Sequence, residues 1–450
     1  MLSSDSLPVG TGLGWSLPLL CDSAQQEQHL DMILRQAPRF GVSALLLRGE
    51  GAALSALSVL ARHEGYPQLS RATEVTFSGR LVTVRERAEQ LVNWRQSLGR
   101  ILAAGFEPWI TISPWADLPL EAWQWYPELA EPEKLAAWLK AGLESIIGAL
   151  PDVHGIRLAL APPEAGPGVA QVSEALALAA APALLVVARE VCLRHQRRLI
   201  WQPGLGPHWL ALQDEWGPEI APLWHGSGQA WQGFETALRP SLLLAATRFT
   251  GMGVTLECAT PGLGAGDWPL CDPDPLWRQA GTLRAIGVQY LWLQLPGPAS
   301  TGESVLETPL AINLWAASHA WQMAPTDPPE PFDWSFWLNW AAQRYGEEVA
   351  PRVVTLGLQT RRMSLLTWCC CGVAGDWLRA DRGPETWEPR LHELRHLLQR
   401  YGCVSAREEK VQAMAIADRA LAGFGSLRQR MPPDAYQTLQ GAFERAREII

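Results

Sequence analysis

Two glutamates stand where apolar, strand-like segments end. Glu164 follows the segment GIRLALAPPEAG (155–166), after two prolines that restrict the backbone and hold the carboxylate in place. Glu257 lies near the end of GVTLECA (253–259), where a charge is costly unless it is paired or faces a wet cavity. Hydrolysis of a glycosidic bond needs two such acids, one to protonate the leaving oxygen and one to attack the anomeric carbon or activate water. We therefore take Glu164 and Glu257 as candidate catalytic residues.

Other polar and aromatic residues follow the same kind of segment and could line one binding site. The candidate substrate-binding residues are Glu50, Trp115, Trp201, Gln202, His225 and Gln294, with Asp117 nearby. Each also has a plainer interpretation. Glu164 could be an ordinary solvated acid, Glu50 a turn residue between two glycines, and His225 a loop histidine.

The elements that must position these residues alternate regularly over about 300 residues. Apolar runs predict strands at 14–20, 42–50, 107–115, 155–162, 198–204, 253–259 and 288–297. Helical periodicity predicts helices at 25–41, 85–105, 132–150, 172–198 and 275–287. A further strand falls either within 206–235 or at 241–248, and the pattern does not decide between them.

This alternation predicts parallel strands with helical crossovers, and eight such units close into a (β/α)8 TIM barrel. A doubly wound open sheet is the alternative, but no Gly-rich phosphate turn follows the first strand. In a barrel of this kind function gathers at the carboxyl ends of the strands. The fold class therefore predicts that Glu164 and Glu257 face one mouth.

After the proline-rich stretch 324–333 the sequence predicts only helices. We expect a barrel domain over 1–323 and a helical C-terminal domain over 324–450. Trp334, Trp337 and Trp340 recur on one helical face, which predicts core packing rather than a binding surface.

Composition limits the partners. With 37 basic and 46 acidic residues the net charge is −9, and no basic stripe stands out, so neither nucleic acid nor an anionic membrane is expected. The N-terminus has no signal-peptide pattern and the apolar run 175–187 is too short to span a bilayer, which predicts a cytoplasmic protein.

None of the eight cysteines forms a CxxC pair, so no metal and no cofactor is expected. Association into a homo-oligomer stays open.

Three segments resemble bacterial α-glucuronidase-type glycoside hydrolases. LPDVHGIRLALAPPE resembles their lead-in to a barrel strand that ends in a glutamate, and FDWSFWLNWAAQRYGEEVAP resembles the helix after their barrel. TPLAINLWAASHAWQ is similar to the helix that leads into it. The resemblance implies a barrel with a helical domain and a glycan substrate that carries a uronic acid. It also implies that Glu164 matches the general acid and Glu257 one of two later carboxylates.

The sequence departs from that family at several points. His154 stands where the family has an acid, prolines precede Glu164, and the family's large N-terminal β-domain has no counterpart. A basic clamp for a uronate could come from Arg48 or Arg248. These departures leave two alternatives: a catalytically inactive barrel that binds glycan or acts as a scaffold, and an enzyme of another class on the same fold.

Overall fold

The structure is a computed structural model of the 450-residue chain. It describes residues 12–20, 23–49, 54–60, 66–77, 80–161, 172–203, 207–216, 220–226, 253–257, 273–295, 306, 311–326, 330–359 and 406–449. Glu50, Glu164 and Arg248 therefore lie outside the described residues.

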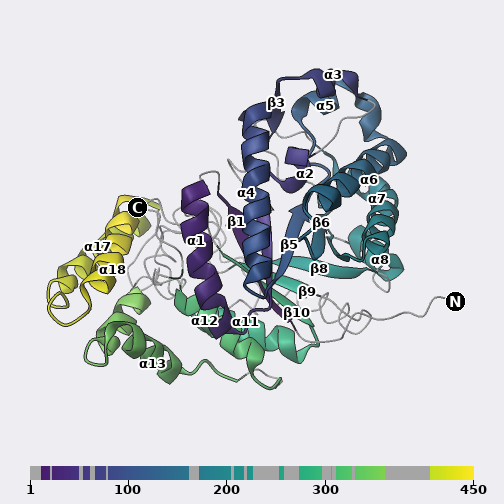
Figure 1. Cartoon of the computed structure of the whole chain (residues 1–450). Coiled ribbons are helices and arrows are strands. Elements are labelled where there is room, and N and C mark those ends of the chain that lie inside the picture. Colours follow the sequence, from purple (N-terminus) through teal and green to yellow (C-terminus); the bar gives the residue numbers. More distant parts are fainter. Residues whose placement is uncertain are drawn as a thin grey trace. The chain divides into compact units, whose positions relative to one another are not determined.

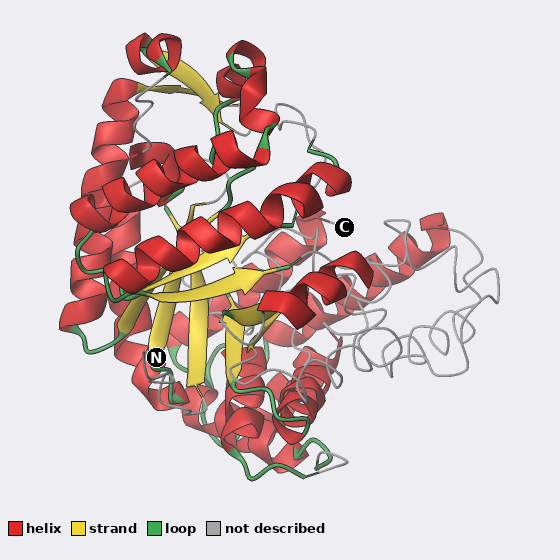
Figure 2. Cartoon of the chain, turned by 90° about the vertical axis from the view of Figure 1, so that its right-hand side faces the viewer, coloured by secondary structure: helices red, strands yellow, loops and turns green. Residues whose placement is uncertain are grey.

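Eight parallel strands form a closed barrel, which confirms the predicted fold class (Figures 1 and 2). Around the barrel the order is β1-β10-β9-β8-β7-β6-β5-β2. The strands are β1 (Gly12–Leu19), β2 (Ala44–Gly49), β5 (Glu107–Ile112), β6 (Gly155–Ala159), β7 (Arg198–Gln202), β8 (Ala221–Gly226), β9 (Gly253–Glu257) and β10 (Tyr290–Gln294). Strand β8 is the one that the sequence left unplaced, and it falls in the first of the two predicted ranges.

Helices connect successive strands and lie outside them in Figure 2. The connecting helices are α1 (Ser23–Gln36) with η1 (Ala37–Phe40), α4 (Val84–Ala103), α6 (Pro132–Ala149), α7 (Glu174–Arg194), α8 (Pro207–Trp216) and α11 (Pro273–Ala285). Side chains cap the starts of α4 and α7, where Thr83 and Ser173 each accept a hydrogen bond from a backbone N–H. Helix α4, for example, begins with a capping box in which Thr83 and Glu86 satisfy each other's backbone N–H groups.

Helix α7 lies within the predicted helix 172–198 and includes the apolar run 175–187. By length and composition it could cross a membrane, but 44% of its apolar window is buried inside the protein. Its buried face packs mainly against α6 and includes Ala177, Leu184 and Val191.

By its internal contacts the chain divides into two compact units. The first unit is Met1–Pro38, Val42–His225 and Arg248–Thr255, and the second is Arg39–Gly41, Gly226–Thr247 and Leu256–Ile450. This division follows contacts rather than the barrel, so the predicted boundary at residue 323 stays a prediction.

In the first unit, short elements extend from the loops after β2 and β5. They are α2 (Ala56–Leu60), α3 (Pro67–Arg71), the antiparallel pair β3 (Glu74–Phe77) and β4 (Arg80–Thr83), α5 (Leu120–Trp125) and η2 (Pro127–Ala130). The carboxylate of Glu121 accepts hydrogen bonds from both the backbone N–H (2.8 Å) and the hydroxyl (2.7 Å) of Thr76. This contact joins the two insertions, and Figure 1 shows β3, α3 and α5 grouped at one end of α4.

In the second unit, α11 packs on α12 (Ala311–Gln322), and an aromatic cluster continues to α13 (Trp334–Tyr345). Trp277 contacts His319, Phe332 and Phe336 in this cluster. Residues 350–359, α17 (Ala406–Phe424) and α18 (Pro433–Ile449) are also helical. The described residues after 324 contain no strand, which agrees with the sequence prediction.

The prediction for the three tryptophans of α13 was wrong for one of them. Trp337 and Trp340 are buried, but Trp334 is 44% exposed and stacks on Trp337. Residues at i, i+3 and i+6 span about 120° of a helix, which is wider than the contact with the core. Trp334 lies at the edge of that arc.

Candidate functional site

Successive side chains of a strand point to opposite faces of the sheet. In the strands of the first unit one face carries only apolar side chains, and the other carries a mixture of apolar, polar and charged ones. Leu47, Ile110, Ile112, Ile156 and Leu158 belong to the apolar set and are fully buried. Apolar residues are what the interface between a barrel and its outer helices requires. The alternate residues, which include all the charged residues of these strands, therefore face the barrel interior.

Three polar side chains of this interior face form one row across neighbouring strands. Leu47 pairs with Ile110, so the next residues, Arg48 and Thr111, lie side by side on β2 and β5. Thr111 in turn pairs with Arg157 on β6. Arg48 and Thr111 each precede the last residue of their strand, and Arg157 is the middle residue of β6. We call Arg48, Thr111 and Arg157 the arginine row.

Both arginines are almost completely buried, with 4% of Arg48 and 6% of Arg157 exposed. Each also makes an interaction within the protein. Guanidinium groups do not lose their charge in proteins, and placing two of them in an interior is costly without an anion to balance them. The row therefore needs negative charge close by, from the chain itself or from a ligand.

Neutral polar groups beside the row have unused hydrogen-bonding capacity. The hydroxyl oxygen of Thr111 and Oε1 of Gln202 are buried and have no hydrogen-bond partner among the residues that the structure describes. Gln202 is the last residue of β7 and pairs with Ala159. Buried polar atoms are nearly always satisfied, so such atoms point to a bound polar molecule or water.

The two tryptophans predicted to bind substrate have packing roles in this structure. Trp115 is 1% exposed and its indole N–H donates to the Leu160 carbonyl oxygen at 2.9 Å. Trp201 is fully buried and donates to the Ile220 carbonyl oxygen at 3.2 Å. It alternates with Gln202 and so points away from the barrel interior. Neither indole presents an open face to a sugar here, and their role in binding stays a prediction.

Asp117 follows Trp115 in the loop after β5 and is buried. Its carboxylate accepts a hydrogen bond from the backbone N–H of Ser113 at 2.8 Å. Burial raises the pKa of Asp117 to about 7, and hydrogen bonds from Ser113, Ser55 and Ser58 offset part of that rise. The Ser58 hydroxyl also donates to the Asp117 carbonyl oxygen at 3.3 Å. These contacts join the loops that follow β2 and β5, beside Arg48 and Thr111.

The remaining predicted residues are placed only in part. Glu257 is the last residue of β9 and His225 lies in β8, but their side chains, like Glu50 and Glu164, fall outside the described part. The separation of the two candidate catalytic carboxylates is therefore untested, and their roles stay predictions. Gln294 ends β10, and its buried Oε1 has no hydrogen-bond partner among the described residues.

Arg157 and Thr111 were missed by the sequence analysis. A signal for Arg157 was present, because it stands in the middle of the apolar strand GIRLA just as Glu257 stands in GVTLE. The argument that a charge in such a strand must be paired or face a wet cavity applies to both. Thr111 gives no comparable signal, since threonine is common in strands.

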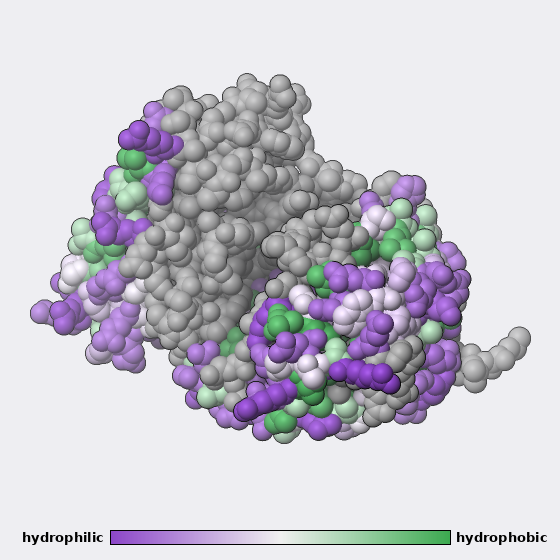
Figure 3. Space-filling model, turned by 90° about the horizontal axis from the view of Figure 1, so that it is seen from above, coloured by the Kyte–Doolittle hydropathy of each residue, from purple (hydrophilic) through white to green (hydrophobic). Residues whose placement is uncertain are grey.

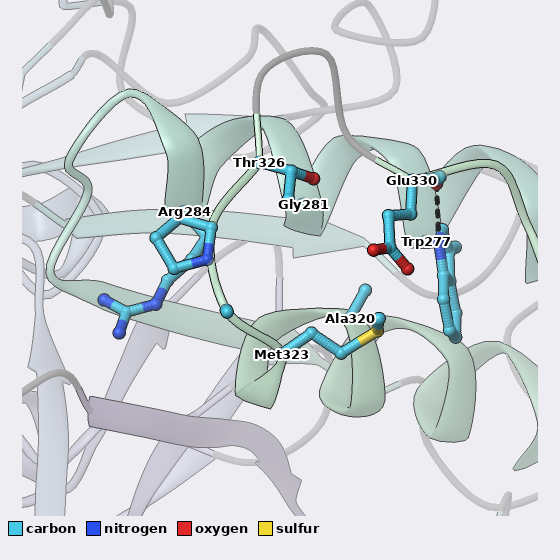
Figure 4. Close-up of a pocket in the computed structure, with 9 residues that line it drawn as sticks. Trp277, Gly281, Arg284, Ala320, Met323, Thr326 and Glu330 are labelled. Atoms are coloured by element: carbon cyan, nitrogen blue, oxygen red, sulfur yellow. Dashed lines mark hydrogen bonds between the residues drawn. The ribbon is translucent and has the colours of Figure 1, made fainter.

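No group of three or more potential metal ligands occurs in the described ranges. A hollow in the second unit is lined by residues of α11, of α12 and of the segment after α12 (Figure 4). Trp277 on one side of it donates its indole N–H to the Glu330 carbonyl oxygen at 3.0 Å. On the visible face in Figure 3 the described residues are mixed, mostly hydrophilic with small hydrophobic groups between them.

Comparisons with known proteins give the fold. No protein-family model matches the chain, and no curated protein matches its sequence. The structure is similar to a GH138 enzyme targeting pectin rhamnogalacturonan II, with a TM-score of 0.60 and 12% identity. The match covers 99% of this chain and 57% of that enzyme, so the chain spans little more than half of its length.

Weaker structural matches exist to other carbohydrate enzymes. A GH20 exo β-N-acetylglucosaminidase from Vibrio harveyi matches with a TM-score of 0.46 and 10% identity, over 77% of this chain and 58% of that one. An L-ribulose 3-epimerase matches with a TM-score of 0.37 and 16% identity, over 76% and 97%. The match to the GH138 enzyme, at 12% identity, shows the fold alone, and the α-glucuronidase resemblance stays a prediction.

Proposed function

We propose that this protein acts on a glycan at the carboxyl end of its barrel, as a glycoside hydrolase-like enzyme. The observation that carries the proposal is the polar interior face at that end, with Thr111 and Gln202 beside the arginine row. A sugar offers many hydroxyl groups that both donate and accept hydrogen bonds, so it can satisfy such groups. The similarity to an enzyme targeting pectin rhamnogalacturonan II supports a carbohydrate ligand.

In the proposed reaction Glu164 is the general acid and Glu257 is the base or nucleophile. Glu257 is the last residue of β9, and Glu164 comes five residues after the end of β6 in the sequence, so we expect both at the carboxyl side of the barrel. An acid on either side of the scissile bond can protonate the leaving oxygen while the second acts on the anomeric carbon or on water. We further propose that the glycan contains a uronic acid, as the motif resemblance implies.

Replacing Glu164 with glutamine tests the catalytic role. Glu164→Gln removes the transferable proton but keeps the side-chain volume, so we expect kcat to fall by about 100-fold or more. The assay is release of chromophore from a panel of aryl glycosides, uronides included, and Tm should stay within about 2 °C of the parent.

Glu133→Gln serves as the control, because Glu133 is an exposed glutamate in the first turn of α6. Its variant should keep full activity. Activity that survives in Glu164→Gln would reject the assignment of the general acid. A parent protein that binds glycans but hydrolyses none of the panel would instead support the alternative of a non-catalytic glycan-binding barrel.

A further inference from the structure

We infer that Trp115 and Asp117 are positioning residues, which together fix the backbone at the carboxyl end of β6 from the loop after β5. Both act through the backbone rather than by touching the substrate. The inference rests on the proposed function in one respect, because Glu164, the proposed general acid, comes four residues after Leu160 in the sequence. It gives Trp115 a role different from the direct contact with substrate that the sequence predicted.

The loop after β5 is buried, although connecting segments normally run over the surface, where water satisfies their backbone polar groups. Its buried residues are Pro114, Trp115, Asp117, Leu118 and Pro119. The carboxylate of Asp117 accepts the Ser113 N–H at 2.8 Å, and the Asp117 N–H donates to the Ser113 carbonyl oxygen at 2.9 Å. The turn from residue 113 to residue 117 is therefore closed by hydrogen bonds between its own ends.

The loop after β2 holds this turn from a second side. The Ser58 hydroxyl donates to the Asp117 carbonyl oxygen at 3.3 Å, and Ser55 and Ser58 both hydrogen-bond to the Asp117 carboxylate. Ser55 follows Leu54, whose N–H donates to Gln90 of α4 at 2.6 Å. Asp117 thereby connects the turn to a long, regular helix.

Trp115 connects the same turn to β6. Its indole N–H donates to the Leu160 carbonyl oxygen at 2.9 Å, and both residues are buried. Leu160 is the first residue after β6, and its own N–H donates to the Gln202 carbonyl oxygen of β7 at 3.0 Å. The backbone of Leu160 is therefore held on two sides, by the neighbouring strand and by Trp115.

The position of this backbone bears on catalysis because the chain continues from Leu160 towards Glu164. A displacement of about 1 Å at a catalytic group is enough to lower the rate by about 100-fold. Without the indole N–H, the buried Leu160 carbonyl oxygen loses its Trp115 partner, and the backbone has to shift to find another. We therefore expect a lower kcat with little change in KM, since the contacts that bind the substrate stay in place.

The first measurement compares kcat and KM on the glycoside that the parent hydrolyses best. Trp115→Phe keeps an aromatic ring and removes the indole N–H, and Asp117→Ala removes the carboxylate. Each is expected to lower kcat about 10-fold, with KM changed by less than about 3-fold. The double variant should lose no more than about 3-fold beyond the larger single loss, because both residues act through Leu160. Asp117→Asn keeps an oxygen for the Ser113 N–H and should stay within about 3-fold of the parent kcat.

The second measurement needs no catalysis. Amide hydrogen exchange of peptides that contain Leu160, followed by mass spectrometry, should be at least about 10-fold faster in Trp115→Phe and Asp117→Ala than in the parent. Peptides from α18 should exchange at the parent rate in every variant. If Asp117→Ala does not fold, Ser58→Ala takes its place, since it removes a single hydroxyl group that holds Asp117.

Trp277→Phe is the matched control. Trp277 is a buried tryptophan whose indole N–H also donates to a backbone carbonyl oxygen, that of Glu330 at 3.0 Å. The substitution removes the same kind of hydrogen bond from a different part of the chain. Its kcat and its exchange at Leu160 should therefore match those of the parent.

Three results would overturn the inference: unchanged exchange at Leu160 in Trp115→Phe, a raised KM with kcat unchanged, or single losses in kcat that multiply in the double variant. The second result would support direct binding of substrate by Trp115. The proposed function fails separately, if the parent hydrolyses no glycoside, and exchange at Leu160 then decides the inference alone. Faster exchange with an unchanged kcat would reject the inference and leave the proposed function standing.

Discussion

Gly49→Ala is expected to lower the free energy of unfolding by about 3 kcal/mol, because the new methyl group has no space. A Cβ at Gly49 would lie closer than 3.0 Å to backbone atoms of Leu54 and Ser55. That backbone is held in place, since the Leu54 N–H donates to Gln90 Oε1 at 2.6 Å and Trp94 donates to the Leu54 carbonyl oxygen at 3.1 Å. The clash must therefore displace the end of β2. Urea unfolding of parent and variant measures the effect.

Gly148→Ala is the control for this prediction. Gly148 lies in helix α6 and a Cβ there would meet nothing within 4 Å. Alanine favours a helix over glycine, so this variant should be as stable as the parent or more stable by up to about 1 kcal/mol. Equal stability of Gly49→Ala and the parent would show that the loop after β2 is not packed as described.

The free energy of unfolding of the parent is expected to fall as pH rises from about 4 to about 7. Asp117→Asn is expected to remove this fall. Burial raises the pKa of Asp117 from 3.8 to about 7 in the folded protein. Below pH 4 both the folded and the unfolded chain hold the proton, and stability is full. Between these values the unfolded chain releases the proton first, so stability falls, and above pH 7 it levels off. The difference corresponds to at most about 4 kcal/mol.

Asparagine suits this test because its amide oxygen can still accept the Ser113 N–H bond. Urea unfolding of parent and variant at pH 5 and pH 8 gives the difference between them at each pH. We expect the variant to gain on the parent by about 2–3 kcal/mol from pH 5 to pH 8. A difference that does not change with pH would contradict the burial of this carboxyl group.

The contribution of His29 to the free energy of unfolding changes with pH in the opposite direction to that of Asp117. It is the same in parent and variant, so it drops out of the difference between them at each pH. Burial lowers the pKa of His29 from 6.5 to about 4. Its contribution is therefore present above pH 6.5 and is lost as pH falls towards 4.

Most strands and helices could be predicted from the sequence because their signals are local. The run around Leu45 and Leu47 predicts β2, and the periodicity of 85–105 predicts α4, almost to the residue. The pair β3 and β4 was not predicted, since four-residue strands contain too few residues to show alternation. Strand β8 stayed ambiguous because glycines, prolines and tryptophans interrupt every period around it.

The amino-acid sequence by itself determined the class of the fold and the end of the barrel where chemistry is expected. Strand and helix periods arise between residues a few positions apart, and the alternation of strands and helices then requires parallel strands. Only the tertiary structure decided that Arg48, Thr111 and Arg157 form one row, and that Trp115 and Trp201 pack inside the protein. The register of neighbouring strands, and the face to which each side chain points, depend on pairing between segments about 50 residues apart. A shift of one residue in that pairing would turn every side chain of a strand to the other face of the sheet.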